Sequence, residues 1–270
     1  MLLNGSINEN EFYSDHYLSE IFEGDIRGVL DEWNARETRE RDEAKTRGEK
    51  GGQYQGYRTP PNRLNGLARD YIQGLREVER IRQPEARVKA HRANLRQLLD
   101  VFDLPFAPQR LRLDDETELP MLGELRSQQD EPLLWVFEAL PALGEEADRA
   151  PLDCQVQPEQ LTSLSAEPLP KEITDARQSP HWEKRLGKQV FSREKPPRWV
   201  LLVGPRQWLL LDRSKFAQHR LLRFDWPELF SRREMPSLKA ASVLLHGESL
   251  LDSQGQNLLD SLDENAHKHA

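Results

Sequence analysis

The stretch RWVLLVGPRQWLLLDR, residues 198–213, constrains the fold of this chain more than any other. Two short apolar runs, 199–203 and 208–211, lie on either side of a Gly-Pro pair. Runs of this length, bounded by turn residues, are typical of buried strands. The Gly204-Pro205-Arg206-Gln207 segment fits the connection between two neighbouring strands. We therefore expect a β-hairpin here.

The hairpin also excludes two nucleotide-binding loops. A phosphate-binding loop needs the pattern Gly-x-x-x-x-Gly-Lys-Ser/Thr, because its backbone N–H groups cradle the phosphates. Here Gly204 is followed by Pro205, which has no N–H. A dinucleotide fingerprint needs three glycines that open a helix, but one glycine is present and an apolar run of strand type follows it.

The remaining pattern predicts helices first and strands later. Apolar spacing predicts a helical N-terminal segment that bends or breaks at Gly24, and a long helix over 61–102 that Pro84 breaks or kinks. Further strands are expected around a turn at Asp114-Asp115, over 131–140 and over 220–224, with helices over 181–192 and after 225. This order predicts an α+β (α/β) fold built around one mixed sheet flanked by helices.

Composition divides the chain into three parts. Residues 1–110 form a helical N-terminal portion with a flexible loop at 36–58, which is charged and rich in glycine. Residues 111–246 form the sheet domain, in which the Pro- and Ser-rich segment 141–180 is expected to be a long surface excursion. Residues 247–270 are a linker. Its Ser261 and Glu264 have the spacing of a capping box, which predicts the start of a helix. We expect this helix to lead into a missing downstream region, so that the chain is either an excised fragment or a naturally split gene product.

Basic residues are concentrated in one segment. The chain has a net charge of −8, so any nucleic-acid contact must be local. Residues 58–112 hold twelve Lys and Arg against six Asp and Glu. An ordinary solvated helix face and a phosphate-facing strip both explain this excess. The candidate phosphate contacts, which helical spacing places away from the apolar stripe, are Arg69, Arg76, Arg80, Arg87 and Arg92.

Carboxylates around the 131–140 run suggest a nuclease of the PD-(D/E)xK type. Such a site holds Mg²⁺ on acidic residues at strand ends, and a lysine positions the attacking water. The candidates are Glu20 on the first helix, Asp130 (or Glu124) before the run, and Glu138 at its end. Leu140 occupies the lysine position of the motif. An active site would need a displaced lysine, for which Lys184 and Lys188 are the candidates.

Three regions carry a family resemblance: NEFYSDHYLSEIF near the start, PRWVLLVGPRQWLLLDR with LLRFDWPELFSRRE in the middle, and LLHGESLLDSQGQNLLDSLDENAHKHA at the end. Together they resemble the N-terminal region of large type IIG-like restriction–modification DNA adenine methyltransferases of bacterial defence islands. The resemblance implies that the mixed sheet is nuclease-like, as part of a degenerate nuclease-like domain that precedes a SAM-dependent methyltransferase. The Asn/Asp-Pro-Pro-Tyr/Phe methyltransferase signature is absent from this chain.

Three functions follow as hypotheses. The first is a non-catalytic, nuclease-like module of a phage-defence protein that contacts DNA or a partner domain. The alternatives are a protein–protein interaction module and an active Mg-dependent endonuclease. We expect no cofactor in this chain, with Mg²⁺ only in an active nuclease and SAM only downstream. The single cysteine, Cys154, and the lack of a membrane-length apolar run predict a cytoplasmic protein without a membrane partner.

Overall fold

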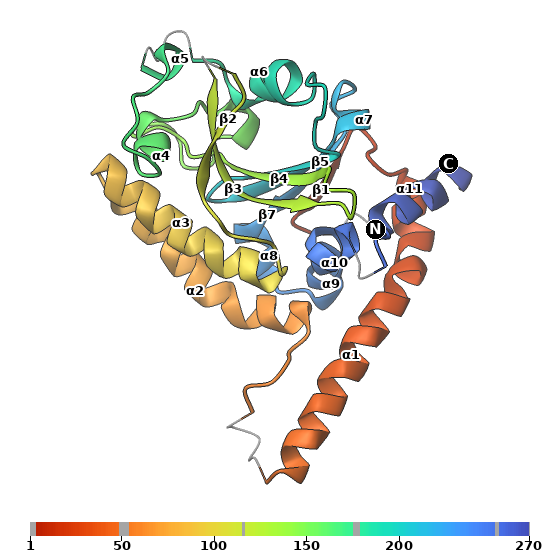
Figure 1. The fold of residues 1–270 in the computed structure, drawn as a ribbon. Helices are drawn as coiled ribbons and strands as arrows, with labels where there is room; N and C mark the ends of the chain where they lie inside the picture. The colour runs from red at the N-terminus through yellow and green to blue at the C-terminus, as the bar shows by residue number, and fades with distance from the viewer. Residues whose placement is uncertain (1–3, 49–53, 115–116, 175–178, 252–253, 270) are drawn as a thin grey trace.

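One mixed sheet organises the molecule. The computed structural model describes residues 4–48, 54–114, 117–174, 179–251 and 254–269. Within these residues the sheet has the order β1-β7-β6-β5-β4-β3-β2 (Figure 1). Its strands are β1 (Ser6–Glu9), β2 (Gln109–Arg112), β3 (Glu118–Arg126), β4 (Pro132–Glu138), β5 (Trp199–Val203), β6 (Gln207–Asp212) and β7 (Leu221–Asp225). Only the β4–β5 pair is parallel; the other neighbours are antiparallel.

The predicted hairpin is confirmed as β5 and β6, in the interior of the sheet. The Gly204 N–H donates to the Gln207 carbonyl at 2.9 Å and closes the turn. Because successive side chains of a strand point to opposite faces, β5 contributes to two cores: Trp199, Leu201 and Val203 enter one, and Val200 and Leu202 enter the other. A strand that is buried on both sides explains the uninterrupted apolar run in the sequence.

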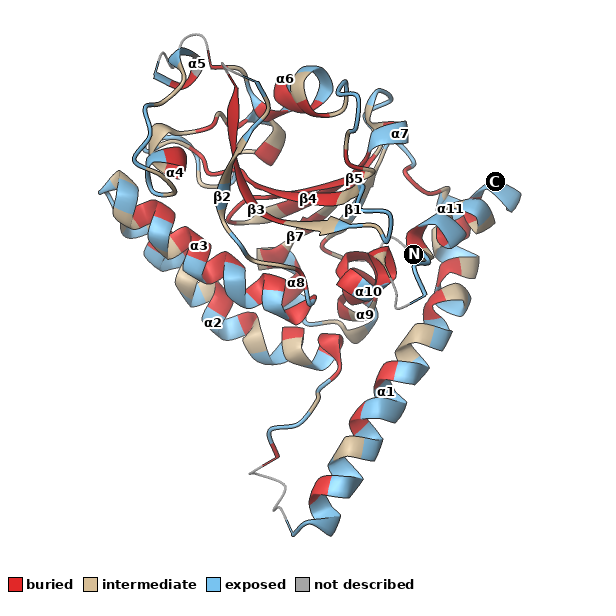
Figure 2. Ribbon diagram, viewed as in Figure 1, coloured by how far each residue is buried: buried red, intermediate tan, exposed pale blue. Residues whose placement is uncertain are grey.

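Helices cover both faces of this sheet (Figure 1). The α-helices of the described ranges are α1 (Phe22–Thr46), α2 (Pro60–Arg80), α3 (Pro84–Val101), α4 (Pro158–Thr162), α5 (Lys171–Thr174), α6 (Trp182–Arg185), α7 (Arg213–Phe216), α8 (Trp226–Arg232), α9 (Met235–Leu245), α10 (Gly247–Leu250) and α11 (Leu258–Lys268), of which α1 extends away from the sheet over most of its length (Figure 1). The larger core lies between the sheet and α2, α3, α8 and α9, whose buried sides face the strands (Figure 2). The fold is therefore α+β, with a mixed sheet flanked by helices, as predicted. No helix of the described ranges is long and apolar enough to cross a membrane.

The N-terminal helical segment is longer than predicted. A π-helical turn, η1 (Tyr17–Ile21), runs directly into α1, and Gly24 does not interrupt it. The helix reaches Thr46, so residues 36–46 are helical where a flexible loop over 36–58 was expected; residues 49–53 lie outside the described ranges. Ion pairs at i, i+4 between Arg36 and Glu40, and between Glu37 and Arg41, support this solvated part of the helix.

Pro84 separates two helices, as predicted. The α2 helix ends at Arg80 and α3 starts at Pro84. Proline is favourable at the first helical position, because an N–H group there would have no partner within the helix and its absence costs nothing. The two helices pack side by side: the Asn94 side chain donates to the Tyr71 carbonyl at 3.2 Å. The predicted turn residue Asp115 lies outside the described ranges, and Asp114 is the last described residue before it.

The segment 141–180 is not simply a surface excursion, because part of it builds the second core. Cys154, Val156, Leu161 and Ile173 are buried against the face of the sheet opposite α2 and α3. Cys154 is the small apolar filler that was expected, and its burial raises the pKa of the thiol to about 12. The apolar residues of this segment were too sparse to show a helical or strand period.

The C-terminal segment 247–270 is packed rather than a linker. The α11 helix begins after Asn257, whose side chain accepts from the Asp260 N–H at 3.3 Å, so Ser261 lies inside the helix and the predicted capping box is wrong. Leu259, Leu262 and Ala266 are buried in the larger core.

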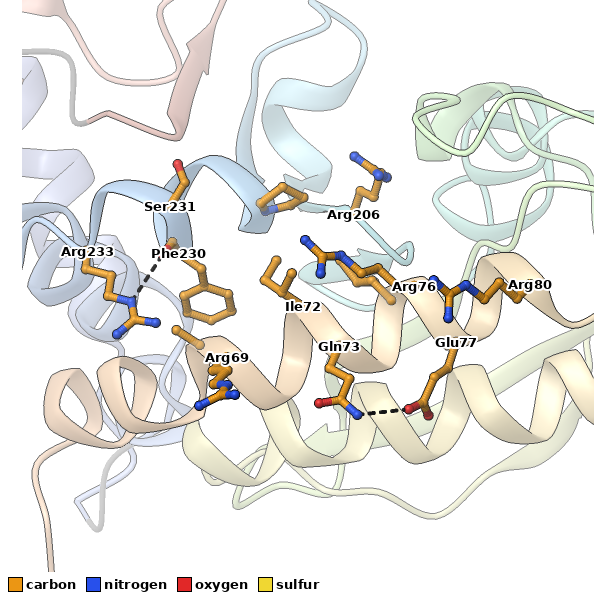
Figure 3. A pocket seen from close by; sticks show the side chains of 13 residues that line it. Arg69, Ile72, Gln73, Arg76, Glu77, Arg80, Arg206, Phe230, Ser231 and Arg233 are labelled. Atoms are coloured by element: carbon orange, nitrogen blue, oxygen red, sulfur yellow. Dashed lines mark hydrogen bonds between the residues drawn. The ribbon is translucent and has the colours of Figure 1, made fainter.

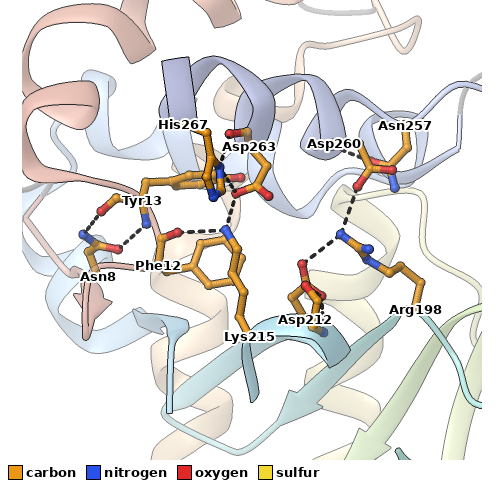
Figure 4. Close-up of polar contacts among 11 residues, drawn as sticks. Asn8, Phe12, Tyr13, Arg198, Asp212, Lys215, Asn257, Asp260, Asp263 and His267 are labelled. Atoms are coloured by element: carbon orange, nitrogen blue, oxygen red, sulfur yellow. Dashed lines mark hydrogen bonds and ion pairs between the residues drawn. The ribbon is translucent and has the colours of Figure 1, made fainter. Parts of the chain in front are cut away.

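Ion pairs fix α11 to the rest of the molecule (Figure 4). Arg198 bridges Asp212 and Asp260 at 2.9 and 3.1 Å, and Lys215 pairs with Asp263. The Lys215 ammonium also donates to the Phe12 carbonyl at 2.9 Å. Residues from both ends of the chain therefore share one core with the sheet, across the expected boundaries at 110 and 246.

Candidate functional site

The candidate nuclease residue Glu138 lies at the end of β4 and is completely buried. Arg92 of α3 donates to its carboxylate from Nε at 3.1 Å and from Nη2 at 2.8 Å. The same guanidinium donates to the Gln160 carbonyl at 2.6 Å and to the Ser163 hydroxyl at 2.8 Å. Glu138 and Arg92 therefore form a structural ion pair, because the guanidinium already compensates the carboxylate charge inside the protein.

His91 completes this buried cluster. Its Nε2 lies 3.8 Å from a Glu138 oxygen. Burial, with a smaller contribution from the neighbouring Arg92 and Arg87, lowers the pKa of His91 to about 3. The imidazole is therefore neutral at physiological pH, and the contact with Glu138 is not an ion pair. Among the described residues, Arg92 is the cation that balances the Glu138 charge.

The position of the missing lysine is also structural. Leu140 is buried and packs with Val78 of α2 and Val88 of α3. Lys184 and Lys188 are exposed, on α6 and on the π-helical turn η4 (Leu186–Val190) that follows it. Neither of these lysines has a hydrogen bond or ion pair with Glu138 among the described contacts. Neither candidate lysine therefore takes the place of the one that the motif lacks.

The other nuclease candidates lie elsewhere. Asp130 is an exposed residue of the β3–β4 turn and pairs with Arg126 at 2.7 Å. It precedes Glu138 by eight residues along an extended segment, which corresponds to roughly 25 Å. Glu20 is an exposed residue of η1. The structure thus does not bring the three carboxylates together, and no group of three or more metal-ligating side chains occurs in the ranges it describes.

The five candidate arginines separate into two sets. Arg87 and Arg92 of α3 are buried. Arg87 donates to the Pro141 carbonyl at 2.6 Å, and burial lowers the pKa of its guanidinium. Both side chains therefore hold α3 against the sheet domain and are not available to a phosphate, contrary to their predicted role.

Arg69, Arg76 and Arg80 of α2 are exposed and line a groove with a volume of about 920 Å³ (Figure 3). Two further arginines join them: Arg206 from the β5–β6 turn and Arg233 from the end of α8. Apolar side chains lie between these charges, and Ile72, Pro227 and Phe230 are the main ones. We call this surface the arginine groove.

The hairpin turn holds both walls of the arginine groove. The Tyr71 hydroxyl of α2 donates to the Pro205 carbonyl at 2.8 Å. The Trp226 N–H, at the start of α8, donates to the Arg206 carbonyl at 2.9 Å. The Tyr71 and Phe230 rings also pack edge to face across the two helices, with centroids 5.7 Å apart. The groove is therefore preformed by contacts that are independent of its charged side chains.

The arginine groove is strongly basic. Glu77 is the acidic residue of its lining, and it accepts from Gln73 rather than from an arginine. Arg206 pairs with Glu79 at 3.0 Å. Arg69, Arg76 and Arg80 have no ion pair or hydrogen bond with any residue that the structure describes. An anionic ligand would reduce the repulsion between these three guanidinium groups.

Sequence reasoning missed Arg206 and Arg233. Arg206 was assigned only to the turn, and nothing in a linear pattern indicates that this turn lies against α2. Arg233 has a φ of 51° in the left-handed region at the end of α8. This conformation is unusual for a residue with a side chain. The signal available in the sequence was the Ser-Arg-Arg-Glu run at the end of a predicted helix.

The five indole rings of the sheet region do not line the groove. Trp182, Trp199, Trp208 and Trp226 are fully buried and Trp135 nearly so, which confirms packing rather than base stacking as their role. Comparison of the chain with family models, with curated proteins and with solved structures gives no match, so the resemblance to restriction–modification methyltransferases stays a prediction.

Proposed function

We propose that this protein is a non-catalytic nucleic-acid-binding module that holds a phosphate backbone in the arginine groove. The observation that carries the proposal is the convergence of five arginines from three separate elements on one preformed groove, in a chain whose net charge is −8. Arginine suits this role because its planar guanidinium donates two parallel hydrogen bonds to a phosphate.

The buried cluster supports the non-catalytic part of the proposal as far as the nuclease motif is concerned. Glu138, the acidic residue at the strand end, is compensated by Arg92, and its lysine partner is replaced by a core leucine. A DNA-contacting role within a larger DNA-modifying defence protein rests on the family resemblance. Contact with a partner protein through the same groove is the alternative outcome of the test below.

The test is a titration of the purified chain with fluorescein-labelled DNA, followed by anisotropy at several salt concentrations. The variant R69A/R76A/R80A removes the unpaired charges of α2. The matched control R27A/R39A/R96A removes the same charge from exposed helical positions outside the groove. We expect the groove variant to bind at least tenfold more weakly. Its plot of log K against log salt should flatten by about 0.7–0.9 for each phosphate that the variant no longer neutralises.

Equal affinity of the two triple variants would contradict the proposal. It would show that net charge alone governs binding. If wild type, control and groove variant all fail to bind DNA at low salt, the groove is not a nucleic-acid site, and the partner-protein alternative takes its place.

A further inference from the structure

The arginine groove has two sides that differ in how its cations are arranged. Arg69, Arg76 and Arg80 follow one face of α2, and the eleven steps from Arg69 to Arg80 correspond to about 16 Å along the helix. Arg206 and Arg233 come from the opposite wall, from the hairpin turn and the end of α8 (Figure 3). A ligand that contacts all five must lie inside the groove, between the walls.

The dimensions of the groove limit what can lie there. Its volume of about 920 Å³ is near the upper end of sites that enclose a small molecule, which are roughly 300–1,000 Å³. A few nucleotides of one strand fit this space. A duplex presents a broad convex surface, so it would contact only the rims.

The helix that carries three of the arginines is held by a neighbouring helix on each of two sides. The α2 helix packs against α3 on one side, where Asn94 bonds to Tyr71, and against α8 on another, where Phe230 contacts the same tyrosine. Helices that read duplex DNA enter the major groove and must project from the protein surface. The arginine face of α2 instead lines the groove beside α8.

The apolar side chains that lie between the arginines form what we call the floor of the groove. Ile72 and Pro227, both partly exposed, lie among the arginines. Proteins that bind single strands combine a cationic groove for the backbone with surfaces on which bases pack. A paired base is hidden inside a duplex, so such a floor contributes binding energy only with an unpaired strand.

We infer that the arginine groove binds single-stranded nucleic acid, with phosphates on the arginines and a base over Ile72 and Pro227. This inference rests on the proposed function and narrows its ligand class. It does not require sequence specificity, because the floor offers apolar contact without a pattern of hydrogen-bond donors.

The test uses fluorescein-labelled twelve-nucleotide oligothymidine and a twelve-base-pair duplex, each titrated with the full chain. We expect the single strand to bind at least tenfold more tightly. With five arginines available, its log K should fall with log salt with a slope no steeper than about −3.5. The variant I72N, with its fold checked by circular dichroism, should weaken single-strand binding severalfold and leave duplex binding unchanged. I72T serves as the milder variant if I72N unfolds.

The outcomes separate the two proposals. Duplex binding as tight as single-strand binding, or an equal weakening of both in a folded Ile72 variant, overturns the single-strand inference and leaves the nucleic-acid function standing. Failure of both probes to bind at low salt overturns both.

Discussion

Two neighbouring helices carry arginines that look alike in the sequence and have opposite roles in the structure. Arg92 of α3 is buried and makes charge-assisted hydrogen bonds to Glu138, a backbone carbonyl and a hydroxyl. Arg76 of α2 is exposed, lines the arginine groove and has no partner among the described residues. The difference teaches that a basic excess along a segment does not define a binding surface. What matters is which charges the fold leaves uncompensated.

The largest effect is expected from the buried pair. Replacing Arg92 by alanine leaves the Glu138 carboxylate buried without a counter-charge. The free energy of unfolding should fall by about 3–5 kcal/mol. Urea denaturation followed by tryptophan fluorescence measures this decrease. The double variant R92M/E138L should recover much of it, because it removes the unpaired charge. A decrease below about 1 kcal/mol in R92A would mean that the pair is not structural.

The second effect concerns pH and His91. Its pKa in the folded chain is about 3, and that of an unfolded histidine is about 6.5. Between these values the unfolded state binds more protons, so stability is complete above pH 6.5 and decreases as the pH falls toward 3. The decrease between pH 6.5 and 5 should be about 2 kcal/mol.

The variant H91Q is the control for this pH dependence. Denaturation midpoints measured from pH 7 to pH 5 should fall less steeply in H91Q than in the wild type. Parallel curves for the two proteins would assign the acid sensitivity to other groups, and the neutral imidazole beside Glu138 would then have no role in it.

A smaller effect of opposite sign is expected at Arg233. Glycine adopts a positive φ without the steric cost that other residues carry. R233G should therefore raise stability by about 0.5 kcal/mol, seen as an increase of about 1–2 °C in Tm. The same change removes a groove cation and should weaken single-strand binding severalfold. Unchanged affinity would place Arg233 outside the ligand contacts.

The smallest change in stability is expected for R76A. An exposed side chain without an ion partner contributes within about 0.5 kcal/mol to folding, although its removal should weaken DNA binding. The free energy of unfolding of R76A, measured under the same conditions as that of R92A, tests the contrast between the arginines of α2 and α3 directly. A destabilisation comparable to that of R92A would show that the α2 arginines are structural as well.

Much of the fold could be predicted because local signals were strong. The apolar runs of β5 and β6 around Gly204-Pro205 specified the hairpin, and Pro84 specified the division between α2 and α3. Weak signals failed. The short edge strand β1 has no extended apolar run, and it is defined by pairing with β7, more than two hundred residues away. The core residues of 141–180 showed no period of their own.

The candidate site was predictable only in part, for a physical reason. The sequence indicated that segment 58–112 was basic and that the nuclease motif lacked its lysine at Leu140. It did not distinguish Arg76 from Arg92, because helical spacing places a side chain on a face and does not identify what covers that face.

By itself, then, the sequence determined the sheet hairpin, the helix break, the α+β class and the replacement of the motif lysine, since each depends on neighbouring residues. Only the tertiary structure decided that Glu138 and Arg92 neutralise each other and that Arg206 and Arg233 meet the arginines of α2. Whether an arginine is paired or free depends on whether the fold buries it beside an opposite charge or leaves it in water. Contacts between residues far apart in the chain decide this burial.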